Sequence, residues 1–188
     1  MHKAFHAALV MVDFINLFDF EEADVLGPRA IKAARATATL KKRARAARIP
    51  CIYANDNFGN WTSEFTALAH ECLKRPGPAA TIARLLQPEK GDLSVLKPRH
   101  SAFYETPLAF LLDDLRVTHL LITGLTVDQC VFATAQDAYV RQYRIWIPSD
   151  CVAANSHAYE KAALGQMART LKARTRPARG ARGFIWNE

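Results

Sequence analysis

Three reactive side chains follow three short apolar segments of the sequence. Asp13 comes directly after ALVMV, Lys97 follows LSVL, and Cys130 follows HLLIT through the turn GLTVDQ. If these segments are parallel strands, their carboxyl ends meet at one edge of a sheet, which is where ligands bind in open α/β folds. The sequence therefore predicts a carboxylate, an ammonium group and a thiol at one site.

This combination suits nucleophilic catalysis by the thiol. A cysteine at a helix N-terminus lies at the positive end of the helix dipole, and a nearby ammonium group stabilises its thiolate further. Asp13 can accept the thiol proton and return it to a leaving group. The backbone N–H groups of the turn and of Cys130 would point at an oxyanion, because the first N–H groups of a helix have no partner within it. The indicated chemistry is acyl transfer to sulfur, followed by hydrolysis.

Each of these residues also has a purely structural interpretation. A cysteine in a Val- and Ala-rich helix start is commonly a small buried hydrophobic residue. Asp13 alone could cap a helix, and Lys97 alone could be a solvated surface charge. Their position at successive strand ends favours the catalytic interpretation. His100, three residues after Lys97, could assist proton transfer or lie on the surface.

The apolar segments alternate with amphipathic, Ala- and Leu-rich stretches, which is typical of βα units around a mostly parallel sheet. Strands are expected over residues 7–12, 50–55, 93–97, 119–123 and 144–148, with a sixth near 172–176. Helices are expected over residues 28–48, 106–115, 130–142 and 158–172. Residues 57–91 are the least regular part, and we expect them to run over the surface and help to roof the site.

Composition indicates one domain spanning residues 1–188, with 50% hydrophobic residues. Of the formal charge of +7, +5 lies beyond Met167, where six basic residues stand against Glu188. The charge is thus a property of a basic C-terminal tail, residues 173–188, and does not indicate a nucleic-acid groove in the body. We expect a small-molecule substrate. A non-catalytic or nucleic-acid-associated protein that uses the tail remains an alternative.

No segment approaches the roughly 18 consecutive apolar residues of a membrane span, and the start shows no cleavage site for a signal peptide. The four cysteines are far apart, with no CxxC or CxxH pair, which argues against a zinc site and against disulfides. These observations predict a cytoplasmic protein with free thiols. Cys51 and Cys151 are expected to be buried and inert, and nothing assigns a role to Cys72.

Residues 120–154, LLITGLTVDQCVFATAQDAYVRQYRIWIPSDCVAA, resemble the signature of the isochorismatase-like cysteine hydrolases. The core of that signature lies at Gly124, Cys130, Val131, Thr134, Ala135, Asp137 and Ala138. Two further blocks agree with the family, namely ALVMVDFIN with Asp13 and LKPRHSAFYETPL with Lys97, Ser101, Ala102 and Phe103.

The resemblance implies a three-layer, Rossmann-like α/β fold, in which helices cover both faces of a mostly parallel six-stranded sheet. It also implies a catalytic triad of Asp13, Lys97 and Cys130, and a cis peptide bond between Leu125 and Thr126. The N–H groups of Thr126 and Cys130 would then form the oxyanion hole. A homodimer or homotetramer is the oligomeric state that the family favours.

One departure concerns metal binding. Nicotinamidase-like members carry a metal site of Asp and several His after the second strand, whereas this chain reads ANDNFGNW with no histidine before His70. Asp56 with Asn neighbours is a poor site for a transition metal. We therefore predict no metal and no cofactor, and the thiol favours cleavage of a carbon–nitrogen bond in a small amide or ureido compound. The alternative is a vinyl-ether hydrolase of the isochorismatase type that uses Asp13 as general acid.

Six residues near the strand ends or in the irregular segment could line the substrate pocket. They are Phe14, Phe18, Asn57, Phe58, Trp61 and Phe103. Aromatic residues there could equally pack in the core, and Asn57 could serve a turn. The identity of the substrate depends on loops and does not follow from the sequence.

Overall fold

The computed structural model describes residues 7–181, 183 and 184. In this part of the chain one sheet contains six strands, with the order β3-β2-β1-β4-β5 and with β6 beside the end of β4. The strands are β1 Ala7–Val12, β2 Cys51–Asp56, β3 Leu93–Lys97, β4 His119–Leu125, β5 Arg144–Trp146 and β6 Val152–Ala153. Every pairing is parallel, so the carboxyl ends of the strands lie at one edge.

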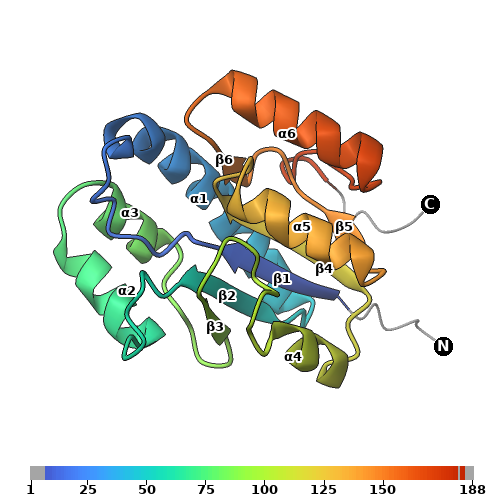
Figure 1. Ribbon diagram of the computed structural model, residues 1–188, viewed down its shortest axis with the longest axis horizontal. Helices are drawn as coiled ribbons and strands as arrows, with labels where there is room; N and C mark the ends of the chain where they lie inside the picture. The colour runs from blue at the N-terminus through green and yellow to red at the C-terminus, as the bar shows by residue number, and fades with distance from the viewer. Residues whose placement is uncertain (1–6, 182, 185–188) are drawn as a thin grey trace.

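Helices cover both faces of the sheet, as Figure 1 shows with α5 in front of the strands and α1 behind them. The helices are α1 Ala23–Ala46, α2 Phe65–Lys74, α3 Pro78–Leu85, α4 Leu108–Asp114, α5 Cys130–Val140 and α6 His157–Thr170. Alternate residues of β1 enter opposite cores, with Leu9 packing among α1, α2 and α3 and Val10 among α4, α5 and α6. The predicted three-layer α/β fold is confirmed.

The sixth strand differs from the prediction. The segment near 172–176 forms only one bridge, between Arg174 and Trp146, whereas the observed strand is Val152–Ala153, beside the end of β4. Ala173 is buried, but the basic residues that alternate with it leave little apolar surface for a strand covered on both faces. The short VA pair is fully buried, although its length is too small to stand out in the sequence.

The irregular segment 57–91 is also more ordered than predicted, because it contains α2 and α3. Gly77 has φ +90° and connects the two helices, and Pro78 is the first residue of α3, where its missing N–H costs nothing. The prolines and the glycine thus mark a boundary between two helices rather than a surface loop. Helix α1 likewise begins at Ala23, five residues before the predicted start at Pro28, which lies inside the helix.

The basic segment after α6 packs against its own chain. The Arg43 guanidinium of α1 donates to the carbonyl oxygens of Ala178, Ala181 and Gly183 at 2.8–3.0 Å. The Asp150 carboxylate accepts the N–H groups of Ala178 and Arg179. The described part of the predicted tail is therefore a strap across α1, while residues 182 and 185–188 lie outside the described residues.

No helix in the described part of the chain is both long enough and apolar enough to cross a membrane.

Candidate active site

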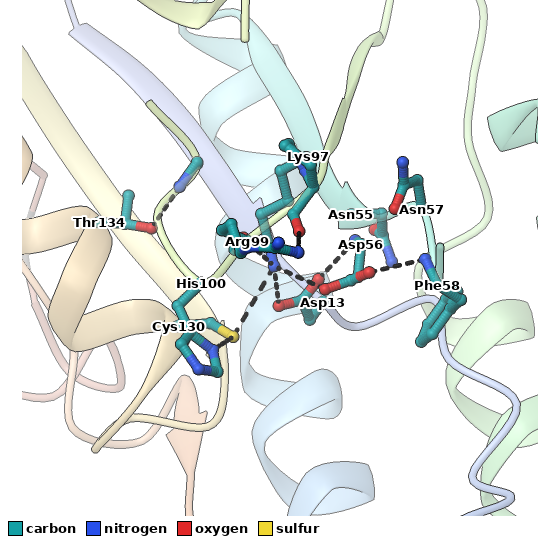
Figure 2. A network of polar contacts seen from close by, with 12 residues as sticks. Asp13, Asn55, Asp56, Asn57, Phe58, Lys97, Arg99, His100, Cys130 and Thr134 are labelled. Atoms are coloured by element: carbon teal, nitrogen blue, oxygen red, sulfur yellow. Dashed lines mark hydrogen bonds and ion pairs between the residues drawn. The ribbon is translucent and has the colours of Figure 1, made fainter. Parts of the chain in front are cut away.

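The structure brings Asp13, Lys97 and Cys130 together at the carboxyl edge of the sheet (Figure 2). Asp13 follows β1, Lys97 ends β3, and Cys130 is the first residue of α5. The Lys97 Nζ atom lies 2.8 Å from Asp13 Oδ2 and 3.7 Å from Cys130 Sγ. A buried ammonium group thus connects a carboxylate and a thiol.

The turn after β1 aims the Asp13 carboxylate into the site. Asp13 has φ +51°, a left-handed conformation that costs a non-glycine residue about 1–2 kcal/mol. The carboxylate is held at both oxygens, because Oδ1 accepts the backbone N–H of Asp56 at 2.8 Å and Oδ2 accepts from Lys97. Burial raises the pKa of Asp13, against the opposing effect of the Lys97 ammonium, and a raised pKa suits a group that takes up and returns a proton.

Lys97 is fully buried, and its ammonium group donates to each of the groups that it contacts. Besides Asp13 and Cys130, its ammonium group contacts the carbonyl oxygen of Arg99 at 3.1 Å and Asp56 Oδ2 at 3.5 Å. Burial by itself lowers the pKa of Lys97, but the charge of Asp13 and the hydrogen bond to it raise the pKa, which ends above its usual value. Lys97 therefore stays protonated in the folded protein.

The charge balance of the site makes Cys130 a neutral thiol at rest. Two carboxylates, Asp13 and Asp56, already surround the single Lys97 ammonium, and a thiolate would add a third negative charge. Burial, followed by the charge of Asp13, raises the pKa of Cys130 to about 12, although Lys97 lowers it. This corrects the expectation of a thiolate stabilised by the helix terminus and the ammonium group. Cys130 must lose its proton during the reaction.

Two hydrogen bonds tie the loop after β3 to α5. Ser101 Oγ donates to Asp137 Oδ2 at 2.5 Å, and the backbone N–H of Ala102 donates to Thr134 Oγ1 at 3.0 Å. Because Cys130 begins the same helix, these bonds set the distance between Lys97 and the thiol. The loop also places His100 Nδ1 3.3 Å from Cys130 Sγ, so the structure brings His100 into the site.

The turn before Cys130 contains a cis peptide bond between Leu125 and Thr126. In this turn, Thr126 Oγ1 and Asp128 Oδ1 are buried and have no hydrogen-bond partner among the described residues. Buried polar atoms are normally paired, so this turn retains unmet hydrogen-bonding capacity beside the thiol. The oxyanion role of the Thr126 and Cys130 N–H groups stays a prediction.

The candidate pocket residues divide into two groups. Phe14 and Phe103 are buried in the two cores, and Phe18 is partly buried against the first core and packs on Phe20. Phe14 and Phe103 thus contribute to core packing, and a role of the three rings in the pocket stays a prediction.

Asn57, Phe58 and Trp61 lie in the loop that follows β2. Asn57 Oδ1 accepts the N–H of Gly59 and stabilises a turn, as the structural interpretation predicts. Phe58 and Trp61 are 50% and 82% exposed, so they are the two aromatic rings of the set that remain available to a ligand. Their role as pocket residues stays a prediction.

Sequence reasoning considered Asp56 only as a metal ligand. In the structure its backbone N–H and its carboxylate contact Asp13 and Lys97. The position of Asp56 at the end of an apolar segment could have pointed to this site, because the structure shows that Asp56 ends β2 in register with Lys97 of β3.

Among the described residues, no group of three or more His, Cys, Asp or Glu side chains could hold a metal ion.

Cys51, Cys72 and Cys151 are buried away from this site, as predicted for Cys51 and Cys151.

A hollow of about 880 Å³ lies elsewhere, between α1, the start of α6 and the C-terminal strap, and its lining includes Arg35, Asp150 and Arg179. None of the residues that line it belongs to the constellation of Asp13, Lys97 and Cys130.

The fold is a parallel α/β sheet with an acid, a lysine and a cysteine at its carboxyl edge, and comparison with known proteins identifies the family. Residues 7–177 match the isochorismatase domain model. The uncharacterized isochorismatase family protein YaaI of Bacillus subtilis is 40% identical over 164 residues, covering 87% of this chain and 90% of that protein. The chain therefore belongs to the isochorismatase family and is a hydrolase.

Other relatives carry names of amidases. The ureidoacrylate amidohydrolase RutB of an Enterobacter species is 41% identical over 58 residues, which span 31% of this chain and 25% of that enzyme. The structure of N-carbamoylsarcosine amidase from Thermoplasma acidophilum is similar with a TM-score of 0.73 and 26% identity, covering 94% of this chain and 99% of that one. A nicotinamidase from Staphylococcus aureus, with TM-score 0.69 and 24% identity over 93% of this chain and 99% of that one, shares the fold.

Proposed function

We propose that this hydrolase cleaves a carbon–nitrogen bond of a small amide or ureido compound through a thioester at Cys130. The observation that carries the proposal is the Lys97 ammonium group placed between Asp13 Oδ2 and Cys130 Sγ. The similarity to a ureidoacrylate amidohydrolase and to N-carbamoylsarcosine amidase supports a substrate with a carbonyl group bonded to nitrogen.

In the first half of the reaction, the thiol proton of Cys130 passes to Asp13 as sulfur attacks the substrate carbonyl carbon. The N–H groups of Thr126 and Cys130 bind the resulting oxyanion, in the manner of preorganised donors. As the carbonyl reforms, the carbon–nitrogen bond breaks and the leaving nitrogen takes the proton from Asp13. Lys97 remains an ammonium group throughout and holds the carboxylate in place.

In the second half, water attacks the thioester, Asp13 takes its proton, and the carbon–sulfur bond breaks. The proton then returns to sulfur and restores the thiol. No step requires a metal or another cofactor. Phe58 and Trp61 would line the mouth of the site, and a homodimer or homotetramer is the assembly we propose.

The test uses the purified protein with a panel of ureido acids, primary amides and isochorismate, each assayed with and without a chelator. We expect ammonia release that survives chelation, loss of turnover in Cys130→Ala, and retained turnover in the control Cys72→Ala. Mass spectrometry with a slow substrate should find an acyl adduct on Cys130 and on none of the other three cysteines. Turnover that persists in Cys130→Ala would contradict the proposal.

A second candidate function is vinyl-ether hydrolysis with Asp13 as general acid. The burial that raises the pKa of Asp13 favours it, because a general acid must hold its proton near neutral pH. In that case Cys130→Ser would keep most activity towards isochorismate and Asp13→Asn would remove it. The proposed thioester route predicts instead that Cys130→Ser and Asp13→Asn both lose activity.

A further inference from the structure

The Cys130 sulfur has a closer nitrogen neighbour than Lys97. His100 Nδ1 lies 3.3 Å from Sγ, whereas Lys97 Nζ lies 3.7 Å away. Figure 2 shows the imidazole ring beside the sulfur, with the Asp13 carboxylate across from it. The ring comes from the loop after β3 and is exposed, so it faces the thiol from the open side of the site.

Two neighbours of the thiol can accept its proton. Asp13 is one of them, because each of its oxygens keeps a lone pair beside the hydrogen bonds that it accepts from Asp56 N–H and from Lys97. The Lys97 ammonium group has donors only. In a neutral imidazole one ring nitrogen carries a free lone pair, and Nδ1 of His100 is the nitrogen within reach of the sulfur.

The charged groups in this part of the site come from the ends of three strands and from one loop. Asp13 follows β1, Asp56 ends β2 and Lys97 ends β3, while Arg99 precedes His100 in its own loop. Asp13, Asp56 and Lys97 are connected to one another by two ion pairs and a hydrogen bond. Arg99 Nη1 donates to the carbonyl oxygen of Pro98. His100, which contacts the sulfur, forms no ion pair within the described residues.

We infer that His100 is a further catalytic residue, a second base that accepts the proton of Cys130 on the exposed side of the site. In this route the S–H proton passes to Nδ1 while the sulfur electron pair forms the bond to the carbonyl carbon. When the carbon–nitrogen bond breaks, the imidazolium returns that proton to the leaving nitrogen. The role in turnover rests on the proposed function, and Asp13 remains the base on the buried side.

A simple alkylation measures the role of His100 independently of the natural substrate. Iodoacetamide forms a carbon–sulfur bond to Cys130 and releases iodide, and the thiol proton goes to a base. The rate at Cys130 is followed by mass spectrometry in the full chain. Because a positioned base contributes about 10²–10⁴-fold and Asp13 remains, we expect His100→Ala to slow alkylation at least about tenfold near neutral pH.

At strongly alkaline pH the thiolate forms without a neighbouring base, so the wild type and His100→Ala should react at equal rates. His100→Gln keeps a hydrogen-bonding side chain but accepts no proton, and it should behave like His100→Ala. His70→Ala is the matched control, because His70 is an exposed histidine of α2, and its rate should equal that of the wild type at every pH.

Equal alkylation rates in His100→Ala and the wild type near neutral pH would overturn the inference, as would full rescue by His100→Gln. These results are separate from a failure of the proposed function. If Cys130→Ala keeps its turnover, the thioester route fails whatever the alkylation shows. If Cys130→Ala is inactive and His100→Ala is alkylated normally, only the role of His100 is lost.

Discussion

The backbone of β4 approaches that of β1 more closely at Gly124 and Val12 than any side chain would permit. A Cβ atom on Gly124 would lie 2.1 Å from the carbonyl oxygen of Val12, and Gly124 has φ +136°. This contact lies one residue before Asp13 and one residue before the Leu125–Thr126 peptide bond. It therefore brings the carboxylate and the turn of the nucleophile to the same point.

Gly124→Ala should consequently be destabilising and inactive. The methyl group meets backbone atoms that cannot turn aside, and overpacking of this kind costs about 1–3 kcal/mol or more, to which the strained φ adds. Urea unfolding measures the loss. Gly165→Ala in α6 is the control, since nothing lies within 4 Å of its Cβ position, and it should be neutral or stabilising by up to about 1 kcal/mol. Equal stabilities of the two variants would contradict this account of the contact.

Lys97→Met should leave a buried, unpaired carboxylate. Breaking a buried ion pair on one side costs about 3–5 kcal/mol, and turnover should disappear. The double variant Asp13→Asn with Lys97→Met removes both charges and should recover part of that stability in urea unfolding. A double variant that is less stable than Lys97→Met would show that the two side chains stabilise the fold independently.

Asp13→Asn should make Cys130 more acidic while it abolishes turnover. The Asp13 charge is the largest cause, after burial, of the raised pKa of Cys130, so its removal lets the thiolate form at lower pH. The thiolate absorbance of each protein, minus that of its Cys130→Ser counterpart, gives the titration of this thiol alone. Asp56→Asn, whose charge ranks lower among the causes, should shift the midpoint less. An unchanged midpoint in Asp13→Asn would refute the charge balance argued for the site.

A buried ion cluster far from the thiol should govern stability at alkaline pH. Lys41 Nζ lies 2.7 Å from Asp92 Oδ2 and 2.8 Å from the carbonyl oxygen of Gln87. Burial alone lowers the pKa of Lys41, but hydrogen bonds to Asp92 and other neighbours outweigh it, and the pKa is raised above 10.5. A raised lysine pKa stabilises the fold fully below its unfolded value and loses this contribution as pH rises through the folded value.

Unfolding free energies measured on either side of pH 10.5 should therefore fall with pH in the wild type and fall less in Lys41→Met. Tyr53 and the thiols of Cys51, Cys72 and Cys130 contribute to the same fall, because burial raises their pKa values, so a smaller slope remains in the variant. Lys42→Met removes the exposed neighbouring lysine and should keep the wild-type slope. If the unfolding free energy of Lys41→Met fell with pH as steeply as that of the wild type, the cluster would not be the source of this pH dependence.

The elements that follow local rules were predictable. Short apolar segments predicted the strands β1 to β5, and the ends of these segments placed Asp13, Lys97 and Cys130 at one edge. The two-residue β6 and the helices α2 and α3 were not predicted, because a strand that short and a boundary marked by Pro76, Gly77 and Pro78 owe their form to what packs against them.

By itself, the sequence determined the family, the alternation of the main strands and helices, and the positions of Asp13 and Lys97 at strand ends and of Cys130 at a helix start. These properties are written in local periodicity and in residue types at fixed spacing. Only the tertiary structure decided that the Cys130 thiol is neutral at rest, that Asp56 completes the charge balance and that His100 reaches the sulfur. The reason is physical: burial and the distance between charges depend on segments that are far apart in the chain, and both shift a pKa away from the value that residue type sets.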